Sequence, residues 1–266
     1  MILRALLGHH WQRHRVPLVL MAVAGGLFEW ALTRVAPSSS ARALVEQVLQ
    51  FAPPALQRML GEEMIANVTP AGVLGFGYVH PFLLVLMSVW VIRVSAGALA
   101  GEIGIGTMDL IASRPVARAA QVGAAAIGIL GGISLIAAAA WAGTAIGVAG
   151  RPLEGVEASA YLPIAGACWL LFAAFGSVGL AISAMRHDAG SAIAWTSGII
   201  ALSFVLDYLA RAWDKMAPFR FLSLFRYYEP SRILRDGLGG TDAVVLASVA
   251  AAGLLVAFTV FQRRDL

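Results

Sequence analysis

The residues over 101–118, GEIGIGTMDLIASRPVAR, combine charged and helix-capping side chains within an otherwise strongly apolar chain. Thr107 is a good N-cap, and Asp109 in the following turn suits the positive end of a helix dipole. Arg114 suits the negative end of the same dipole, and Pro115 prevents the helix from continuing. This spacing predicts a short, capped helix of about two turns.

The predicted helix covers residues 108–113 and has an apolar surface formed by Ile105, Met108, Leu110 and Ile111. A helix this short is unstable alone in water, so either the lipid interface or a groove on a partner protein must hold it. A short rigid helix that joins the inner ends of two membrane spans can transmit motion from a cytoplasmic protein. An ordinary capped turn would carry the same capping residues, so capping chemistry alone leaves both interpretations open.

Motifs for catalysis are absent from the sequence. A P-loop requires G-x-x-x-x-G-K-[ST], but the single lysine, Lys215 in WDKMA, has no glycine frame. H-E-x-x-H, G-x-S-x-G and G-x-G-D are also missing, which disfavours an intramembrane enzyme. His10 and His14 have a spacing that can hold a metal, but a solvated interfacial helix face is the favoured interpretation. The sequence therefore predicts no catalytic residues and no metal site.

The composition is that of a membrane protein. Of the 266 residues, 59% are hydrophobic and only 13% are charged, with a mean hydropathy of +0.80. A soluble domain of this length would carry roughly 25% charged residues. The net charge of +4 comes with no long basic run, so nucleic-acid binding is not expected. Cys168 is the single cysteine, which excludes a disulfide framework within the chain.

The apolar stretches predict an all-α polytopic membrane protein with one permease domain over residues 1–266. Six of these stretches are long enough to cross ~30 Å of hydrocarbon. They lie near 16–33, 76–99, 119–148, 160–184, 190–210 and 242–262. Residues 1–15 place Leu3, Leu6, Leu7 and Trp11 on one helical face, which predicts an amphipathic helix on the membrane surface.

Arginines near the span ends predict the orientation. With six alternating spans, one side receives the arginines of the N-terminal tail, the 100–118 loop, the 185–189 turn and the C-terminus. Both termini are therefore expected in the cytoplasm, and residues 34–75 and 211–241 outside it. For these outer loops, interfacial helices with an aromatic belt and snorkelling arginines are favoured over a ligand site.

Three charged residues fall within the predicted spans, where each costs ~2.5–3.5 kcal/mol at mid-bilayer unless it is paired or snorkels. Glu29 and Asp207 are about one turn from the outer ends of their helices, so we expect both to snorkel toward the headgroups. Arg93 lies deeper, about 13 Å from Glu102 at the helical rise. This depth argues against a direct pair with Glu29 or Asp207. We expect Arg93 to face a neighbouring helix, a partner subunit or a polar cavity.

The 102–118 segment resembles the cytoplasmic loop of ABC transporter permeases of the type-two exporter class. That family has an acid, Gly-Thr, an acid, a Leu-rich pair and Arg-Pro-Val-x-Arg between its second and third spans. The matching residues here are Glu102, Gly106, Thr107, Asp109, Leu110, Ile111, Arg114, Pro115, Val116 and Arg118. The order of elements is similar along most of the chain. Departures are the single acid at Glu102, where two are common, and alanine at positions 117 and 124.

The resemblance implies that the 100–118 loop carries a coupling helix that docks on a cytoplasmic ATPase. The implied contact residues are Glu102, Thr107, Met108, Asp109, Leu110, Arg114, Pro115 and Arg118. Spans two and five line the central path in the family. The resemblance therefore makes Arg93 the candidate residue of the translocation pathway.

The resemblance also implies an exporter with two membrane subunits, either a homodimer or this chain with a related permease, and two ATPase subunits. The ATPase subunits bind ATP and Mg, so this chain needs no cofactor of its own. The strong preference for arginine over lysine suggests a bacterial genome rich in G and C. The expected location is therefore the bacterial inner membrane, in contact with lipid. The alternative is a non-transporting membrane scaffold that recruits a cytoplasmic partner through the same loop.

Overall fold

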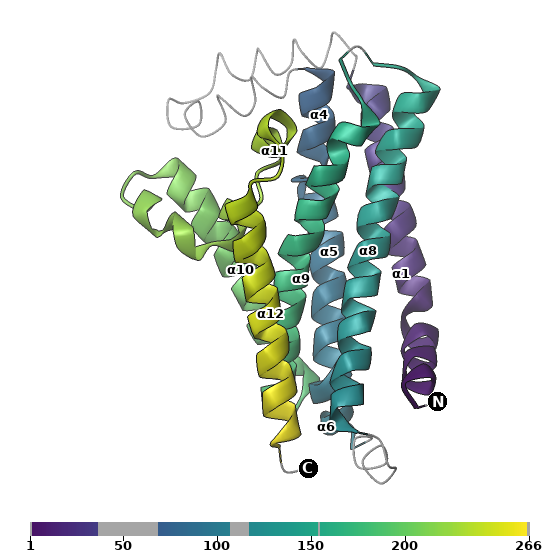
Figure 1. Cartoon of the computed structure of the whole chain (residues 1–266), viewed down its shortest axis with the longest axis vertical. Helices are drawn as coiled ribbons and strands as arrows, with labels where there is room; N and C mark the ends of the chain where they lie inside the picture. Colours follow the sequence, from purple (N-terminus) through teal and green to yellow (C-terminus); the bar gives the residue numbers. More distant parts are fainter. Residues whose placement is uncertain (1, 37–68, 107–116, 154, 265–266) are drawn as a thin grey trace.

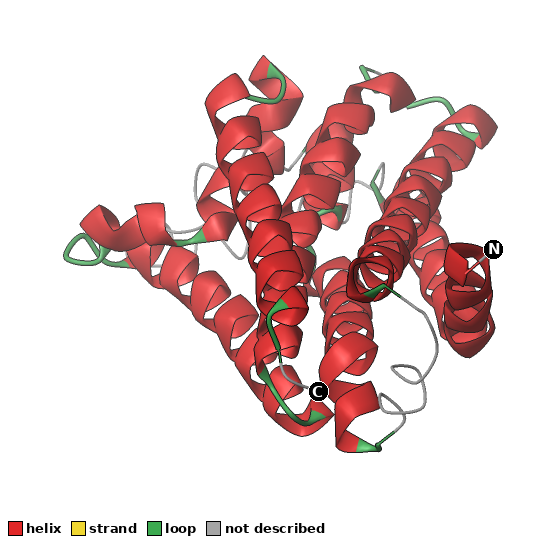
Figure 2. Ribbon diagram, turned by 60° about the horizontal axis from the view of Figure 1, so that its bottom comes forward, coloured by secondary structure: helices red, strands yellow, loops and turns green. Residues whose placement is uncertain are grey.

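The computed structural model describes residues 2–36, 69–106, 117–153 and 155–264. Over these residues the chain is a bundle of long helices, and the described ranges contain no β-strand (Figures 1 and 2). Six helical runs are long and apolar enough to cross a membrane. The expected all-helical fold with six candidate spans is thereby confirmed.

The helices follow one another with short connections in the described ranges. The long ones are α1 (Ile2–Val35), α5 (Pro81–Ala96), α8 (Arg118–Gly150), α9 (Leu162–Met185), α10 (Ala189–Ala212) and α12 (Gly240–Gln262). The short ones are α4 (Pro70–Gly77), α6 (Glu102–Gly104), α11 (Pro230–Asp236), a π-helical turn η1 (Gly97–Gly101) and the 3₁₀ turns η2 (Ala158–Tyr161), η3 (Ala217–Leu222) and η4 (Leu224–Tyr227).

The second candidate span, Pro70–Gly104, is a broken helix rather than a single rod. The imidazole Nδ1 of His80 accepts a hydrogen bond from the backbone N–H of Phe82 at 3.2 Å and caps α5. Pro81 occupies the first helical position, where a missing N–H costs nothing. The predicted boundaries of 76–99 therefore begin in the last turn of α4, span the break before α5 and end inside η1.

The first span is continuous with the residues before it. The sequence predicts residues 1–15 as a separate helix on the membrane surface. In the structure, the described part of this segment and the first span form the single helix α1, with Pro17 inside it. Proline removes one backbone hydrogen bond and often kinks a helix, but here the helix continues on both sides. Part of the N-terminal segment packs on the bundle, since the side chain of His14 is buried.

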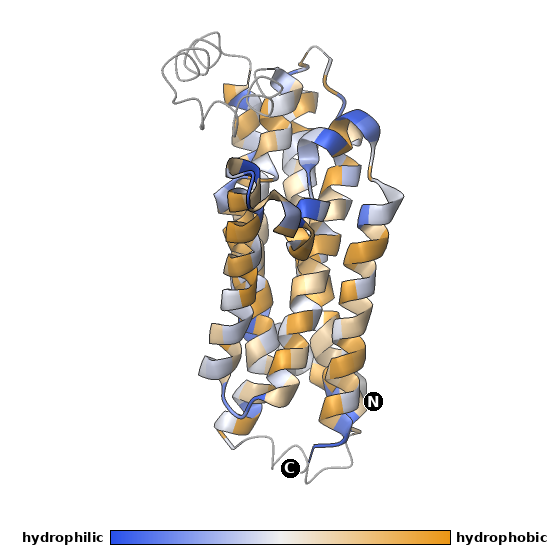
Figure 3. Cartoon of the chain, turned by 90° about the vertical axis from the view of Figure 1, so that its left-hand side faces the viewer, coloured by the Kyte–Doolittle hydropathy of each residue, from blue (hydrophilic) through white to orange (hydrophobic). Residues whose placement is uncertain are grey.

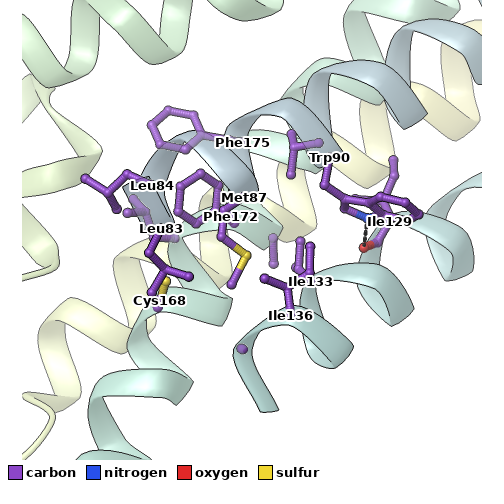
Figure 4. Packing of buried hydrophobic residues seen from close by; sticks show 14 of the residues in the cluster. Leu83, Leu84, Met87, Trp90, Ile129, Ile133, Ile136, Cys168, Phe172 and Phe175 are labelled. Carbon is purple, nitrogen blue, oxygen red and sulfur yellow. Dashed lines mark hydrogen bonds between the residues drawn. The ribbon is translucent and has the colours of Figure 1, made fainter. Parts of the chain in front are cut away.

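The apolar core is centred on α9, the most buried of the spans, which packs against α5, α8 and α12. Figure 4 shows Phe172 and Phe175 of α9 beside Met87 and other apolar side chains of α5 and α8. The indole N–H of Trp90 donates to the carbonyl of Ile129 at 3.2 Å, which satisfies its polar atom inside the core. By contrast, α1, α10 and α12 carry largely exposed apolar faces suited to lipid. Figure 3 shows that hydrophobic residues occupy most of the length of the helices.

Glycines allow α1 and α8 to approach at backbone distance. A Cβ atom on Gly143 would collide with the carbonyl oxygen of Gly26, and one on Gly147 would collide with the side chain of Thr33. Close approach through small residues is the usual way in which membrane helices gain packing energy. The two helices therefore form a tight pair on one side of the bundle.

Candidate functional site at the charged end of the bundle

The start of α1, the short helix α6, the start of α8 and the end of α12 all lie at one end of the bundle (Figure 1, lower end). This is the end from which residues 107–116 depart between α6 and α8. Six of the predicted contact residues lie outside the described residues, namely Thr107, Met108, Asp109, Leu110, Arg114 and Pro115. The other two, Glu102 and Arg118, flank this segment and are placed by the structure.

Glu102 ties the first flank to α1. Its carboxylate Oε1 accepts from the guanidinium Nη1 of Arg13 at 2.5 Å, and its side chain is only 14% exposed. Because the ion pair is also a hydrogen bond, it fixes the position of Glu102 relative to α1. The two residues are far apart in sequence, and the fold brings them together because α1 continues past the membrane-spanning stretch.

The π-helical turn η1 positions α6 and therefore Glu102. Within it, the N–H of Ala100 donates to the hydroxyl Oγ of Ser183 on α9 at 3.0 Å, and that hydroxyl lies 3.4 Å from the carbonyl of Ala96. A π-turn leaves backbone groups available to side chains, which explains why a buried serine can bind here. The end of the second span is thus fastened to α9 by hydrogen bonds as well as by packing.

Arg118 ties the second flank to α12. It is the first residue of α8, and its Nη1 donates to the carbonyl of Gln262 at 3.0 Å and to that of Arg264 at 2.6 Å. The last carbonyls of a helix have no partner within the helix, so a cation placed there satisfies them and the helix dipole together. Both flanks of residues 107–116 are therefore joined to other spans.

Arg264 extends this connection to α9 and α10. Its Nη1 donates to the carbonyls of Ala184 at 2.6 Å and Arg186 at 2.8 Å, and its Nη2 lies 2.8 Å from Nδ1 of His187. Desolvation lowers the pKa of Arg264, but a guanidinium still keeps its charge at neutral pH. In the sequence, Arg264 contributes only to the predicted orientation of the spans in the membrane. No local pattern signals the contacts that it makes in the fold.

Arg93, the predicted pathway residue, lies on an exposed face of α5 together with Phe82, Val85 and Val89. Within the described part of the chain its side chain makes no hydrogen bond and no ion pair. It is therefore not paired with Glu29 or Asp207, in agreement with the depth argument from the sequence.

The prediction that Glu29 and Asp207 snorkel is wrong, because both side chains are buried in the fold. Glu29 is 0% exposed, and its Oε2 lies 3.5 Å from the hydroxyl of Thr144 on α8. Asp207 accepts from Nε of Arg211 at 2.9 Å and from Nε of Arg220 at 2.8 Å. The chain after α10 folds back and supplies Arg220, while Gly77 at the end of α4 lies against the carboxyl group of Glu29.

Metal binding finds no support in the part of the chain that is placed, where no three His, Cys, Asp or Glu side chains gather. The predicted solvated face is also wrong for His14, which is 6% exposed and packs edge-on against Trp90 with ring centroids 6.0 Å apart. Because α1 packs on α5 at this level, His14 faces the bundle. The side chain of His10 lies outside the described residues.

A family model described as ABC-2 family transporter protein matches residues 18–266, which include all of the last five candidate spans and both flanks of residues 107–116. No curated protein gives a significant match to the chain. The family match agrees with the helical architecture, with its six candidate spans, and with the resemblance of the 102–118 segment. The chain therefore belongs to the ABC-2 transporter family and is a multi-pass membrane permease component of an ABC transporter.

Proposed function

We propose that this chain forms the translocation pathway of an exporter and is driven by a separate cytoplasmic ATPase that docks on residues 102–118. Two ATPase subunits bind and hydrolyse ATP with Mg, and a second copy of this chain completes the membrane domain. The assembly resides in the bacterial inner membrane with both termini of the chain in the cytoplasm. Substrate leaves outward or into the outer leaflet.

The observation that carries the proposal is the anchoring of both flanks of residues 107–116 to distant spans. Glu102 is bonded to Arg13 of α1, and Arg118 is bonded to the end of α12. A protein that binds between these flanks can therefore act on several spans at once, which is what coupling to an ATPase requires. The family match supports an ABC-type partner.

The exposed side chain of Arg93 supports a second copy of the chain. A guanidinium in the hydrocarbon region costs ~2.5–3.5 kcal/mol unless it is paired or reaches water. In the described part of a single chain Arg93 has no such partner, and its neighbours on the same face are apolar. In a homodimer that face lines a water-filled path between the copies, and Arg93 then lies in the translocation pathway.

Pull-down of the tagged chain from native membranes, followed by mass spectrometry, tests the ATPase contact. The comparison is with a double variant, Asp109→Lys/Arg114→Glu, which reverses both charges of the predicted helix without changing the net charge of the pair. We expect a stoichiometric ATPase with Walker motifs in the wild-type sample and its loss from the double variant.

The other outcomes separate the alternatives. Absence of an ATPase from both samples would overturn the exporter proposal and favour the scaffold that recruits a different cytoplasmic protein. An ATPase retained by both samples would keep the transporter but remove the docking surface from Asp109 and Arg114. Stimulation of the bound ATPase by a transported compound would exclude the non-transporting scaffold.

A further inference from the structure

We propose that Arg264 is a positioning residue that carries movement of the 102–118 segment, through Arg118, to the turn between α9 and α10. This inference rests on the proposed function, because it concerns what happens inside the membrane domain after an ATPase has docked. It assigns a transmitting role to a residue beyond the last span, remote in sequence from the docking segment.

The first step of the path is the bond between Arg118 and the end of α12. The carbonyl of Arg264 accepts from Arg118 at 2.6 Å, and the carbonyl of Gln262 accepts from the same nitrogen at 3.0 Å. Arg118 is the last residue of the segment proposed to dock, and only Ala117 separates it from residues 107–116. A displacement of that segment therefore pulls on the end of α12 as well as on α8.

The second step is the fork made by the side chain of Arg264. It contacts three acceptors around the end of α9, namely the carbonyls of Ala184 and Arg186 and the imidazole of His187. The planar guanidinium holds its donors in a fixed geometry, so these contacts define a direction as well as a distance. The backbone of Arg264 is thus bonded to the α8 side, and its side chain to the α9–α10 turn.

The third step is the rigid connection from this turn to α10. Asp188 follows His187 and caps α10, with its Oδ1 accepting from the N–H of Ser191 at 2.7 Å. The guanidinium of Arg186 also lies over the indole of Trp195 at 5.0 Å from the ring centroid. These two contacts bind the turn to the first turns of α10, so a shift of the turn reorients that helix.

The fold leaves α10 free to respond. Only 22% of the most apolar window of α10 is buried, the same share as for α12, whereas the corresponding value for α9 is 78%. The helices α9 and α12 are locked together, since a Cβ on Gly253 would approach the backbone of Ser177 to 2.7 Å. We expect α9 and α12 to resist a displacement of Arg264, because they are packed closely together. The loosely covered helix α10 is the one able to move.

The test compares Arg264→Ala with the matched control Arg263→Ala. Both variants remove one positive charge at adjacent positions, but Arg263 is exposed and its side chain makes no hydrogen bond or ion pair within the placed residues. Each chain is purified in lipid nanodiscs with its co-purifying ATPase. Hydrogen exchange is then measured by mass spectrometry with and without ATP plus vanadate, over peptides covering 100–118 and 184–191.

In the wild type and in Arg263→Ala, we expect the nucleotide to change exchange in both peptides. In Arg264→Ala we expect the change over 100–118 to persist, while the change over 184–191 falls about threefold to tenfold. ATPase binding in the pull-down should be unaltered, because the docking segment is intact. A nucleotide-driven change over 184–191 that survives in Arg264→Ala at its wild-type size would overturn the inference.

Arg264→Lys guards against a variant that merely fails to fold. Lysine keeps the charge but cannot span the same acceptors as a fork, so it should fold normally and still lose most of the change over 184–191. A lysine variant with the full wild-type response would also overturn the inference. If no ATPase co-purifies with the wild type, the proposed function fails. That result differs from a complex in which the nucleotide changes exchange over 184–191 equally with and without Arg264, which overturns only the present inference.

Discussion

The carboxyl groups of Glu29 and Asp207 both lie inside membrane-spanning helices, with different partners. Asp207 is flanked by Arg211 and Arg220, so its charge is compensated. Glu29 is fully buried, and within the described ranges it forms no ion pair, only a long hydrogen bond with Thr144. An ionised carboxylate without a cation is very costly in such a place, whereas the protonated acid is a small polar group. We therefore expect Glu29 to be uncharged.

Substitutions at Glu29 should separate shape from charge. Glu29→Gln should keep the free energy of unfolding within about 1 kcal/mol of the wild type, since the amide matches the protonated acid. Glu29→Ala should lower it by about 2–4 kcal/mol, because it leaves a cavity where the carboxylate now packs against Gly77. Unfolding the wild type and both variants in the same detergent measures these changes in the free energy of unfolding. Equal damage in the two variants would show that the charge itself is needed.

The segment between α10 and α11 shows how an irregular element is held against a helix. The hydroxyl of Ser223 donates to the carbonyl of Ser203 at 2.7 Å, and Arg220 reaches Asp207 from the turn η3. Phe219 and Phe221 of the same turn remain exposed, as an aromatic belt requires. The predicted aromatic character is therefore present, but Arg220 turns inward to an acid instead of snorkelling.

Removal of the Asp207 carboxylate should release this segment. Asp207→Ala leaves Arg220 without its acid and Arg211 with only the more distant Glu229, at 3.9 Å. We expect a loss of about 1–3 kcal/mol in stability, reduced from the fully buried case because both arginines are partly exposed. Hydrogen exchange over 213–227 should accelerate in the same variant. Asp214→Ala is the control, as it removes an exposed acid of the same segment. Similar exchange in both variants would mean that packing alone holds the segment.

At the scale of the whole molecule, the charged ends of α1, α6, α8 and α12 converge (Figure 1). Arg13, Arg118, Arg186 and Arg264 all belong to this end, through their contacts with Glu102, with one another's backbone or with the α9–α10 turn. Of the arginines that the sequence assigned to one side of the membrane, these four thus share one end of the bundle. From the positive-inside rule we expect that end to be cytoplasmic.

Cysteine labelling should verify this orientation. Cys168 is buried and is the single natural cysteine, so it should not react. Lys215→Cys, in the exposed segment after α10, should be labelled by a membrane-impermeant maleimide in intact cells. Arg263→Cys should be labelled only after the inner membrane is opened. The reverse pattern would place the docking segment outside the cell and contradict the coupling role.

The six spans follow from the sequence because a membrane interior supplies no water to backbone groups, so each long apolar run must form a helix that satisfies them internally. The capped, charged segment at 102–118 is equally local, since helix capping and proline act within a few residues. For this reason the sequence alone predicts the capping residues of this segment and its family resemblance.

Except for Asp207 and Arg211, which lie four residues apart on one helix, the partners of these charged side chains were decided by the tertiary structure. Arg264 and Ala184 are 80 residues apart, and Arg13 and Glu102 are 89 apart, so no local pattern relates them. The burial of Glu29 likewise depends on the close approach of α8 and on the break in the second span. The free energy of a charge in a membrane depends on what surrounds it in space, and only the packed helices determine those surroundings.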